Sequence, residues 1–597
     1  MVKRFLITTA LEETWCDDEP ILFLGEWCRR YDRKQKWRNL DAEVVPYHWD
    51  DREKLHRDYL YLQDVYDKFL AELREHLNAL HGVDHSLRYW QILIGPWLGY
   101  FIQMLFDRWT MLQQAVKDYE ITGSRVISKN GCSFVPNDME DFIRNFLTDE
   151  WNEAICGELL ECMGVPVVRV AGRSEAQPSR PKNCGIRVGF KQKIKRTLAQ
   201  AVSHLSGMVC SETEYFFIST YLPVKQDLSL QLKLGQLPKR WSQSTVPHCP
   251  VDRAAREQRL AFPDEAGNFT IIARAMIQRH IPTAYQEGYM DLVVATKKLS
   301  WPNRPKAIFT SVSWESDDLF KAWAADKVAD GALLLLGQHG GSYGMALWGF
   351  TEDHQIAISD RFLTWGWRQA EQQKVTPIGN LKGFGKTQAI DKNGIALLVE
   401  MAMPRTSYHM YSVPVAHQWL NYFDDQCRFV KALPPDLREQ LLVRLYLHDY
   451  GWCQRQRWKD RFPSIRLDDG HQPIASLISK SRLYISSYNA TTYLESLSLN
   501  IPTIMFWNPE HWELRDSAIP AFEKLKSVGI FHETPESAAH QMTRVWNDID
   551  AWWQNEATQR VRREFCEIYA HLPDHPLDFL ENIFRDVVAE GALAKQL

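Results

Sequence analysis

Short apolar runs alternate with amphipathic stretches along most of the C-terminal half of the chain. The apolar runs have the length and flanking residues of buried strands, and the amphipathic stretches have helical spacing. The expected strands are 394–401, 441–447, 482–488 and 501–507, and the expected helices are 415–433, 473–481, 491–500 and 521–529. Strands that alternate with helices of this length predict a doubly wound parallel sheet.

The N-terminal half shows a similar pattern with a long helical interruption. Strands are expected at 4–9, 21–25, 305–311, 331–337 and 355–360, with a helix at 317–329. Residues 51–119 have apolar positions at helical spacing, and we read them as a helical insertion.

The region 371–394, rich in Lys, Gly and Gln, is expected to link two domains. The sequence thus predicts an α/β protein with two Rossmann-like domains. Residues 1–370 would form the N-terminal domain and residues 371–597 the C-terminal domain. Two such domains around a cleft suggest the architecture of many nucleotide-sugar glycosyltransferases, so the first is expected to hold the acceptor and the catalytic group and the second the sugar donor. The last helices are expected to pack back on the first domain.

Composition narrows the class of protein. The chain has 597 residues, of which 45% are hydrophobic and 24% charged, as in globular proteins. A net charge of -5 argues against a nucleic-acid binder. The 11 cysteines include no CxxC pair, and the N-terminus lacks a secretory apolar region, so a cytoplasmic location is expected. The apolar run 92–106 contains Pro96 and is shorter than the roughly 20 residues of a spanning helix, which favours a buried core helix.

One stretch is strongly basic. No acidic residue occurs from 177 to 211, whereas seven basic residues do: Arg180, Lys182, Arg187, Lys191, Lys193, Lys195 and Arg196. A solvated loop is one interpretation. The other is contact with anionic lipid head groups, which would hold the protein at the inner face of the inner membrane.

The clearest candidate ligand site is YISSYNATTYLES, 484–496, where a strand runs into the start of a helix. Ligands of open α/β sheets bind beyond the carboxyl ends of the strands, and a helix N-terminus attracts phosphate. The candidate donor residues are Ser487, Asn489, Thr491 and Thr492, with Glu495 for ribose hydroxyls. Capping of the helix by these side chains is the competing interpretation.

Two further segments contribute candidates. Arg444 lies on the strand at 441–447 and His448 directly follows it; Arg444 would contact phosphate and His448 phosphate or base, although a structural arginine is the alternative. The loop GQHGGSYG, 337–344, would face the donor from the other domain. Its glycines allow close approach of the backbone, so Gly337, Gln338, Gly340 and Gly341 are expected to line the cleft, with His339 as an acid, base or phosphate contact.

Transfer of a sugar needs a carboxylate near the anomeric carbon. Glu352 and Asp360 are the candidates because they follow the glycine loop, and Glu12 and Glu13 are weaker ones. No HExxH, EF-hand or GxSxG motif occurs. We therefore expect metal-independent catalysis without a cofactor, in which basic groups and a helix N-terminus neutralise the leaving phosphate.

Several long segments together resemble a family of transferases encoded in O-antigen and other surface-polysaccharide gene clusters. They are LITTALEETW, PYHWDD, HGVDHSLRYWQILIGPWLGYF, GQHGGSYG, SDRFLTWGW and YNATTYLESLSLNIPTIMFWNPEHWELRD. The resemblance implies a GT-B-type glycosyltransferase that uses a nucleotide-sugar donor and builds lipopolysaccharide O-chains. The family is more distantly similar to retaining bacterial β-Kdo transferases, which implies CMP-β-Kdo as the donor. Those enzymes carry a His-Pro motif, whereas His448 is followed here by Asp449.

Two other functions stay open at this point. One is a transferase of polyol phosphate from a CDP-alcohol on a similar fold. The other is a non-catalytic protein that binds a nucleotide sugar or a glycan. Donor hydrolysis distinguishes an enzyme from a binding protein.

Overall fold

The computed structural model describes most of the chain. The described residues are 2–16, 18–128, 134–171, 202, 205–208, 210–243, 245–257, 268–369, 371–384 and 388–594. The basic stretch at 180–196 lies outside them. Within the described part, no helix is both long and apolar enough to cross a membrane.

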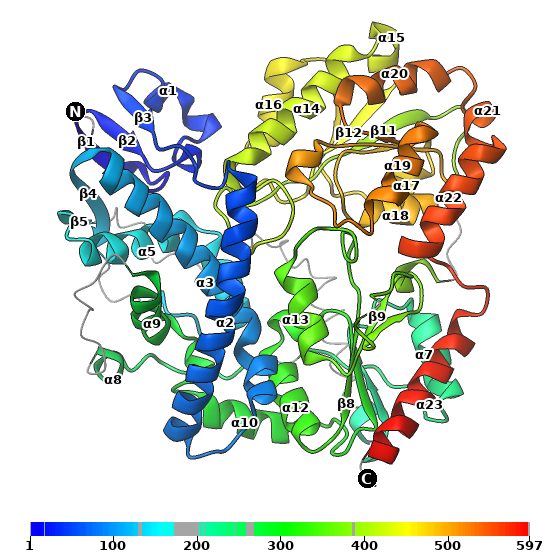
Figure 1. Cartoon of the computed structure of the whole chain (residues 1–597), viewed down its shortest axis with the longest axis horizontal. Helices are drawn as coiled ribbons and strands as arrows, with labels where there is room; N and C mark the ends of the chain where they lie inside the picture. The colour runs from blue at the N-terminus through cyan, green and yellow to red at the C-terminus, as the bar shows by residue number, and fades with distance from the viewer. Residues whose placement is uncertain are drawn as a thin grey trace.

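Three parallel sheets form the framework (Figure 1). The first has the order β3-β2-β1-β4-β5, the second β10-β9-β8-β7-β6, and the third β13-β12-β11-β14-β15-β16. This confirms the predicted α/β class with parallel sheets. Residues 1–370 contain most of two separate sheets, a division that the sequence pattern did not reveal.

The strand bounds are as follows. The first sheet contains β1 (Lys3–Ile7), β2 (Ile21–Phe23), β3 (Ala42–Val44), β4 (Glu120–Ser128) and β5 (Val167–Ala171). The second contains β6 (Tyr215–Phe217), β7 (Ala307–Thr310), β8 (Leu333–Gly337), β9 (Arg361–Thr364) and β10 (Val375–Pro377). The third contains β11 (Ile395–Val399), β12 (Leu441–Arg444), β13 (Arg466–Asp468), β14 (Ser481–Ser486), β15 (Thr503–Phe506) and β16 (Phe531–His532).

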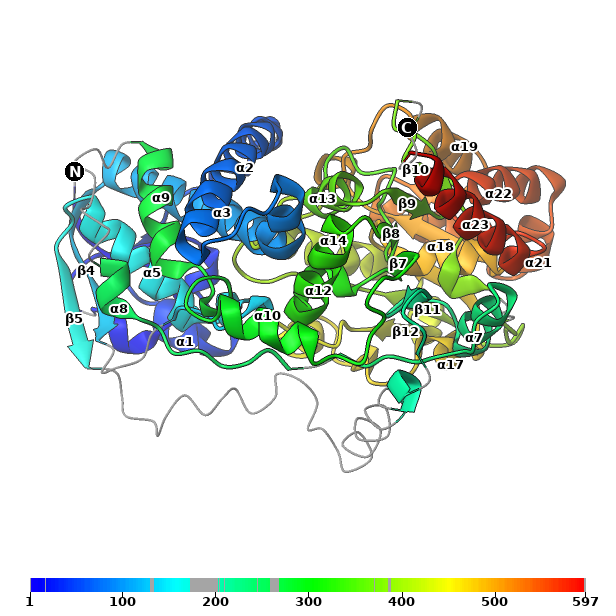
Figure 2. The same ribbon diagram turned by 90° about the horizontal axis from the view of Figure 1, so that it is seen from below.

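Two long helices, α2 (Arg52–His81) and α3 (Leu87–Asp118), cross the middle of the molecule (Figures 1 and 2). The apolar run 92–106 lies inside α3 and is buried, so the predicted core helix is confirmed. Gly99 lets a second helix approach closely, because a Cβ there would lie 1.9 Å from the Phe350 ring. The helical insertion thus joins the first sheet to the layers around the second.

The remaining longer helices cover the sheets. Around the first and second sheets they are α4 (Met139–Phe146), α5 (Asp149–Cys162), α7 (Val224–Lys233), α9 (Phe269–His280), α10 (Tyr289–Lys297), α12 (Asp318–Ala329) and α13 (Phe350–Ile358). Around the third sheet they are α14 (Trp419–Ala432), α16 (Gln454–Arg461), α18 (Thr491–Ser498), α19 (Ile519–Ser527), α20 (Pro535–Val545) and α22 (Glu556–Tyr569).

The last helix, α23 (Pro576–Ala594), runs beside the second sheet rather than the third (Figure 1). Its Phe584 ring lies 5.2 Å from that of Phe217 and 5.4 Å from that of Phe309. Aromatic contacts at these distances stabilise the packing beyond the effect of burying apolar area. The chain therefore ends by crossing back to the second sheet.

The strand expected at 355–360 is wrong. Residues 350–358 form α13, and the chain turns at Ser359 before β9 begins. Ile356 and Ile358 alternate with smaller or polar neighbours as in a strand, but Phe350 and His354 are one helical turn apart and both face α3. Tertiary packing of that face decides the structure.

Candidate active site

The carboxyl ends of the second and third sheets meet at two loops. Loop 337–344 follows β8, and the segment before α18 follows β14. The Gly341 N–H donates to Thr491 Oγ1 at 3.0 Å, and a Cβ on Gly341 would lie 2.1 Å from the Ala490 carbonyl carbon. We call this contact region the junction. The two loops expected to face one another thus lie in direct contact, while their roles in binding stay predictions.

The N-terminus of α18 has no side-chain cap. Ala490 occupies the N-cap position, and no side chain accepts a capping hydrogen bond from the backbone N–H groups of the first turn. Ser487 instead donates to the Val399 carbonyl at 3.0 Å, and Asn489 accepts from the Tyr493 hydroxyl at 2.8 Å. The capping interpretation is therefore wrong. The backbone N–H groups that open α18 keep the partial positive charge that favours an anion.

The next turn of α18 carries an ion pair across the junction. Glu495 Oε1 lies 3.0 Å from the Nζ of Lys382, which comes from the η5 turn (Leu381–Gly383). The Lys382 ammonium also lies 5.2 Å from the centre of the Tyr221 ring. Thr492 Oγ1 is 3.1 Å from the Tyr488 hydroxyl. Lys382 adds a positive charge that the sequence did not single out.

Arg444, the last residue of β12, and His448, on the loop after it, have different surroundings. Arg444 donates to Asp468 at 2.9 Å and to the Gly470 carbonyl at 3.0 Å, so its guanidinium joins β12 to the end of β13. This geometry favours the structural alternative. His448 is exposed on the loop that follows β12.

A pocket of about 480 Å³ opens beside that loop. Its lining includes one aromatic ring and three basic side chains: Tyr446, Arg455, Lys459 and His471. Arg455 is paired with Asp469, which also lines the pocket. Tyr446 also lies close enough to Tyr488 to raise the pKa of that phenol, although burial is the main cause. The pocket and the junction are therefore neighbours at the edge of the third sheet.

His339 lies in the loop after β8, as expected. Its Nδ1 is 3.3 Å from the Tyr343 hydroxyl, and burial lowers its pKa to about 4. The imidazole is therefore neutral at pH 7. Gln338 donates to the Gly340 carbonyl at 2.8 Å and accepts from the indole of Trp367 at 2.9 Å, so it holds the loop rather than facing a ligand. The Gly337 backbone is packed against Ser311, where a Cβ would lie 2.5 Å from the hydroxyl oxygen.

Glu352 is occupied by protein partners. It lies on α13 and accepts from the Gly344 N–H and from Arg515, both at 2.8 Å. Burial raises its pKa, and the Arg515 charge opposes that shift. Glu352 thus ties loop 337–344 to the segment after β15.

Asp360 lies away from the junction. It comes just before β9 and accepts from the Leu334 N–H at 2.7 Å and from Arg88 at 2.9 Å. Leu334 is near the start of β8, and the register pairs Gly337 with Leu363. Asp360 is therefore at the amino end of the sheet, three residues or about 10 Å from the level of Gly337. The expectation that it reaches the same cleft is wrong.

The other two carboxylates considered belong to the first sheet. Glu12 is paired with Arg33 and Lys36, which lower its pKa to about 2. Glu13 is exposed on the same short turn, η1 (Glu12–Thr14). No contact at the junction involves either residue among those that the structure describes.

The structure brings a different carboxylate to the ligand edge of the second sheet, by which we mean the edge formed by the carboxyl ends of its strands. Glu315 lies in α11 (Ser313–Ser316), directly after β7, and the Tyr100 hydroxyl donates to it. Its neighbour Trp314 has its ring 6.1 Å from that of His339. Burial raises the pKa of Glu315. The position after a predicted strand was visible in the sequence, but the contact with Tyr100 of α3 was not.

A segment from the third sheet completes this group. Residues 401–417 follow β11, and the His409 ring stacks on Tyr100 at 4.8 Å and on Tyr411 at 4.6 Å. Burial lowers the pKa of His409 to about 3, with a smaller contribution from His339. We call Tyr100, Glu315, His339 and His409 the junction cluster. Its members come from four segments that are distant in sequence.

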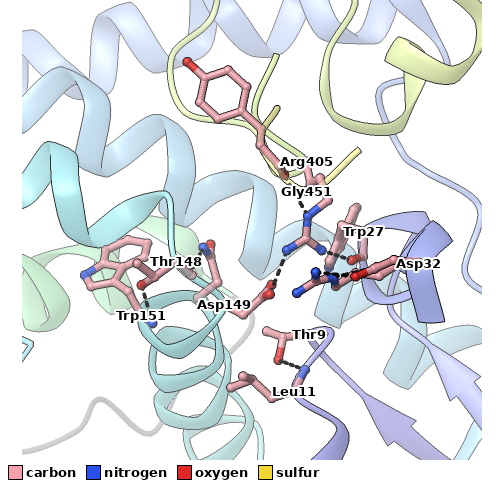
Figure 3. Close-up of polar contacts among 12 residues, drawn as sticks. Thr9, Leu11, Trp27, Asp32, Thr148, Asp149, Trp151, Arg405 and Gly451 are labelled. Atoms are coloured by element: carbon pink, nitrogen blue, oxygen red, sulfur yellow. Dashed lines mark hydrogen bonds and ion pairs between the residues drawn. The ribbon is translucent and has the colours of Figure 1, made fainter. Parts of the chain in front are cut away.

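Arg405 holds the 401–417 segment against the first sheet (Figure 3). Its guanidinium donates to Asp149 at 2.7 Å, to the Tyr450 carbonyl at 3.0 Å and to the Trp27 carbonyl. Figure 3 shows Arg405 lying between Asp149 of α5 and Trp27 of the short turn that follows β2. The contact fixes the segment that presents His409.

No cluster of three or more His, Cys, Asp or Glu side chains suited to a metal occurs in the described part of the chain. The expectation that catalysis is independent of a metal stays a prediction.

A family model described as LIC12162 family transferase matches residues 4–584. No curated protein matches the chain.

The chain is weakly similar in fold to several solved structures, including the following three. MurG from Acinetobacter baumannii is 12% identical, with 67% of this chain and 97% of that chain covered and a TM-score of 0.31. The spinosyn rhamnosyltransferase SpnG is 11% identical, with 62% and 99% covered and a TM-score of 0.32. The wall teichoic acid polymerase TagF is 8% identical, with 67% and 98% covered and a TM-score of 0.31. Similarities this weak say nothing about substrate or mechanism.

Proposed function

The chain belongs to the LIC12162 family of transferases, and we propose that it transfers a sugar from a nucleotide-activated donor to a surface glycan at the junction. One observation carries the proposal. The uncapped N-terminus of α18, at the ligand edge of the third sheet, contacts the glycine loop at the ligand edge of the second. Parallel α/β sheets bind ligands at these edges.

The donor phosphate would be held by the first N–H groups of α18, with Lys382 supplying a positive charge. These groups stabilise a leaving phosphate without a metal ion. The nucleoside would extend toward the pocket beside Tyr446, whose volume of about 480 Å³ is in the range of small-ligand sites. Of the predicted donor residues, Thr491, Thr492 and Glu495 lie nearest this arrangement, whereas Arg444, Ser487 and Asn489 are occupied by protein partners.

The resemblance to β-Kdo transferases makes CMP-β-Kdo the first donor to test, with retention of configuration as the expected outcome. The expected acceptor is a growing lipopolysaccharide O-chain or another surface glycan. The basic stretch at 180–196 would bring the protein to anionic lipid near such acceptors.

The first test is thermal unfolding of the purified chain with CMP, CDP, UDP, GDP and dTDP. We expect one of these nucleotides to raise the melting temperature, because a ligand that binds only the folded state stabilises it. Lys382→Met should reduce that shift. Lys392→Met is the matched control, since Lys392 pairs with Asp550 on the surface of the third sheet.

The second test is release of the nucleotide from its sugar. An enzyme transfers the sugar to an acceptor or slowly to water, whereas a binding protein leaves the donor intact. Release of an alditol phosphate from a CDP-alcohol would support the other transferase instead. No stabilisation by any of the five nucleotides, together with no donor turnover, would overturn the proposal.

A further inference from the structure

We propose that Glu315 is the catalytic base that takes the proton from the acceptor hydroxyl. This inference rests on the proposed function and adds to it the residue that activates the acceptor. No sequence motif pointed to Glu315; its position in the fold does.

The first argument is location. Glu315 follows β7, and His339 follows the neighbouring strand β8, so both lie at the edge of the second sheet that faces the third. Trp314 and His339 have rings 6.1 Å apart, which places α11 beside the glycine loop. That loop in turn contacts the N-terminus of α18. A base at Glu315 is thus near the place where the donor phosphate would lie.

The second argument is the orientation of the carboxyl group. The Tyr100 hydroxyl donates to Oε1, and no contact to Oε2 is among the described hydrogen bonds and ion pairs. Tyr100 is itself fixed by stacking on His409. A carboxylate held by one oxygen keeps the other for a substrate hydroxyl. Glu315 is partly exposed, unlike Glu352.

The third argument is charge. The titratable groups that face Glu315 are Tyr100 from α3, Lys321 from α12 and Tyr343 from loop 337–344. Lys321 and the Tyr100 hydroxyl favour the carboxylate, whereas burial disfavours it. A base whose pKa is raised toward the working pH accepts a proton more readily than an ordinary carboxylate.

The chemical step balances without another reactant. The acceptor O–H bond breaks and its proton passes to the Glu315 carboxylate. The acceptor oxygen forms a bond to the anomeric carbon, and the leaving group departs with its bonding electron pair. In a single displacement that group is the nucleotide phosphate, and in the second step of a double displacement it is an enzyme carboxylate. Both mechanisms need a base that deprotonates the acceptor hydroxyl.

The test compares Glu315→Gln, Glu315→Asp and Tyr100→Phe with the wild-type chain. Glu315→Gln should lower the transfer rate about 100- to 10,000-fold, which is the usual contribution of a positioned base. The thermal shift with the nucleotide should stay unchanged, because the proposed donor contacts lie on α18, at Lys382 and in the pocket beside Tyr446, and Glu315 is none of these. Glu315→Asp should restore part of the rate, since it keeps a carboxylate.

Tyr100→Phe gives a readout that loss of structure alone would not produce. It removes the hydrogen bond that lowers the pKa of Glu315. The base then stays protonated to higher pH, so the acidic limb of the pH–rate profile should move to higher pH. Near-native transfer by Glu315→Gln, or an unmoved limb in Tyr100→Phe, would overturn the assignment. If wild-type protein transfers no sugar, the proposed function fails; if it transfers and Glu315→Gln does too, only the assignment of Glu315 fails.

Discussion

Two adjacent glycines give a sharp test of the contact at the junction. A Cβ on Gly341 would lie 2.1 Å from the Ala490 carbonyl carbon and 2.6 Å from the Thr491 nitrogen. Both atoms belong to the backbone and cannot rotate away. A Cβ on Gly340 would lie 3.7 Å from the nearest atom, the Thr491 hydroxyl oxygen, which is an ordinary contact. Gly341→Ala should therefore disturb the junction, and Gly340→Ala should not.

The size of the effect follows from the overlap. Ordinary carbon contacts are 3.4–4 Å, so the added methyl group of Gly341→Ala penetrates its neighbour by more than 1 Å. Overpacking of this kind costs about 1–3 kcal/mol. If the strain is relieved by separation of the two loops, the population of the closed junction falls about 5- to 150-fold.

The assay measures the transfer rate and the nucleotide affinity of both variants. Gly341→Ala should lower the transfer rate by that factor and change the affinity less, because the first turn of α18 belongs to the third sheet alone. Gly340→Ala should stay within about twofold of the wild-type rate. Equal rates for the two variants would refute the claim that this contact is needed for transfer.

Three further predictions concern stability, each measured by urea unfolding. Arg405→Met should lower the free energy of unfolding by about 1–3 kcal/mol, because it leaves the carboxylate of Asp149 unpaired; Arg428→Met, at an exposed ion pair, should cost less than about 1 kcal/mol. Glu352→Gln should cost about 2 kcal/mol through its lost charge while the transfer rate stays measurable below the melting temperature, and complete loss of transfer in a folded variant would restore Glu352 as a catalytic candidate. Glu12 has a folded-state pKa lowered to about 2, so its carboxylate stabilises the fold above pH 5 and this contribution is lost as the pH falls toward 2. Glu12→Gln should therefore be less stable than wild type at pH 7 and equal to it near pH 2, and a constant difference across that range would contradict the ion-pair explanation.

The sequence predicted the four central strands of the third sheet because they alternate with helices in one pattern, whereas the short edge strands β13 and β16 were not predicted. The apolar runs around Leu397, Val443, Ile485 and Ile504 are buried strands, and each ends at the same edge. The proximity of GQHGGSYG to YNATT followed from the rule for parallel sheets, without any contact being known.

The first sheet and α13 were harder to predict for physical reasons. The strands β1 and β4 are paired although the 30-residue helix α2 and the 32-residue helix α3 separate them, and no local pattern encodes such a pairing. In α13 the alternation of Ile356 and Ile358 imitates a strand, while the deciding contact is Phe350 against Gly99 of α3.

The catalytic candidates show a similar limit. Distance along the chain favoured Glu352 and Asp360, but the first is bound by Arg515 and the second lies at the amino end of its strand. Glu315 satisfies the rule of strand ends, yet its importance depends on Tyr100, 215 positions away. The sequence alone predicts which carboxylates follow the carboxyl ends of the strands. The side chains that contact them, which only the structure shows, determine which of these carboxylates is accessible.

The most direct test of the account is amide hydrogen exchange with and without the nucleotide that stabilises the fold. We predict slower exchange at residues 490–495, where α18 begins, and at 337–344, the glycine loop, because a phosphate bound there would engage the first N–H groups of the helix and close the junction. Residues 8–16, at the ligand edge of the first sheet, should exchange at the same rate in both states. Protection of residues 8–16 with no change at 490–495 would contradict the central claim that the junction of the second and third sheets is the active site.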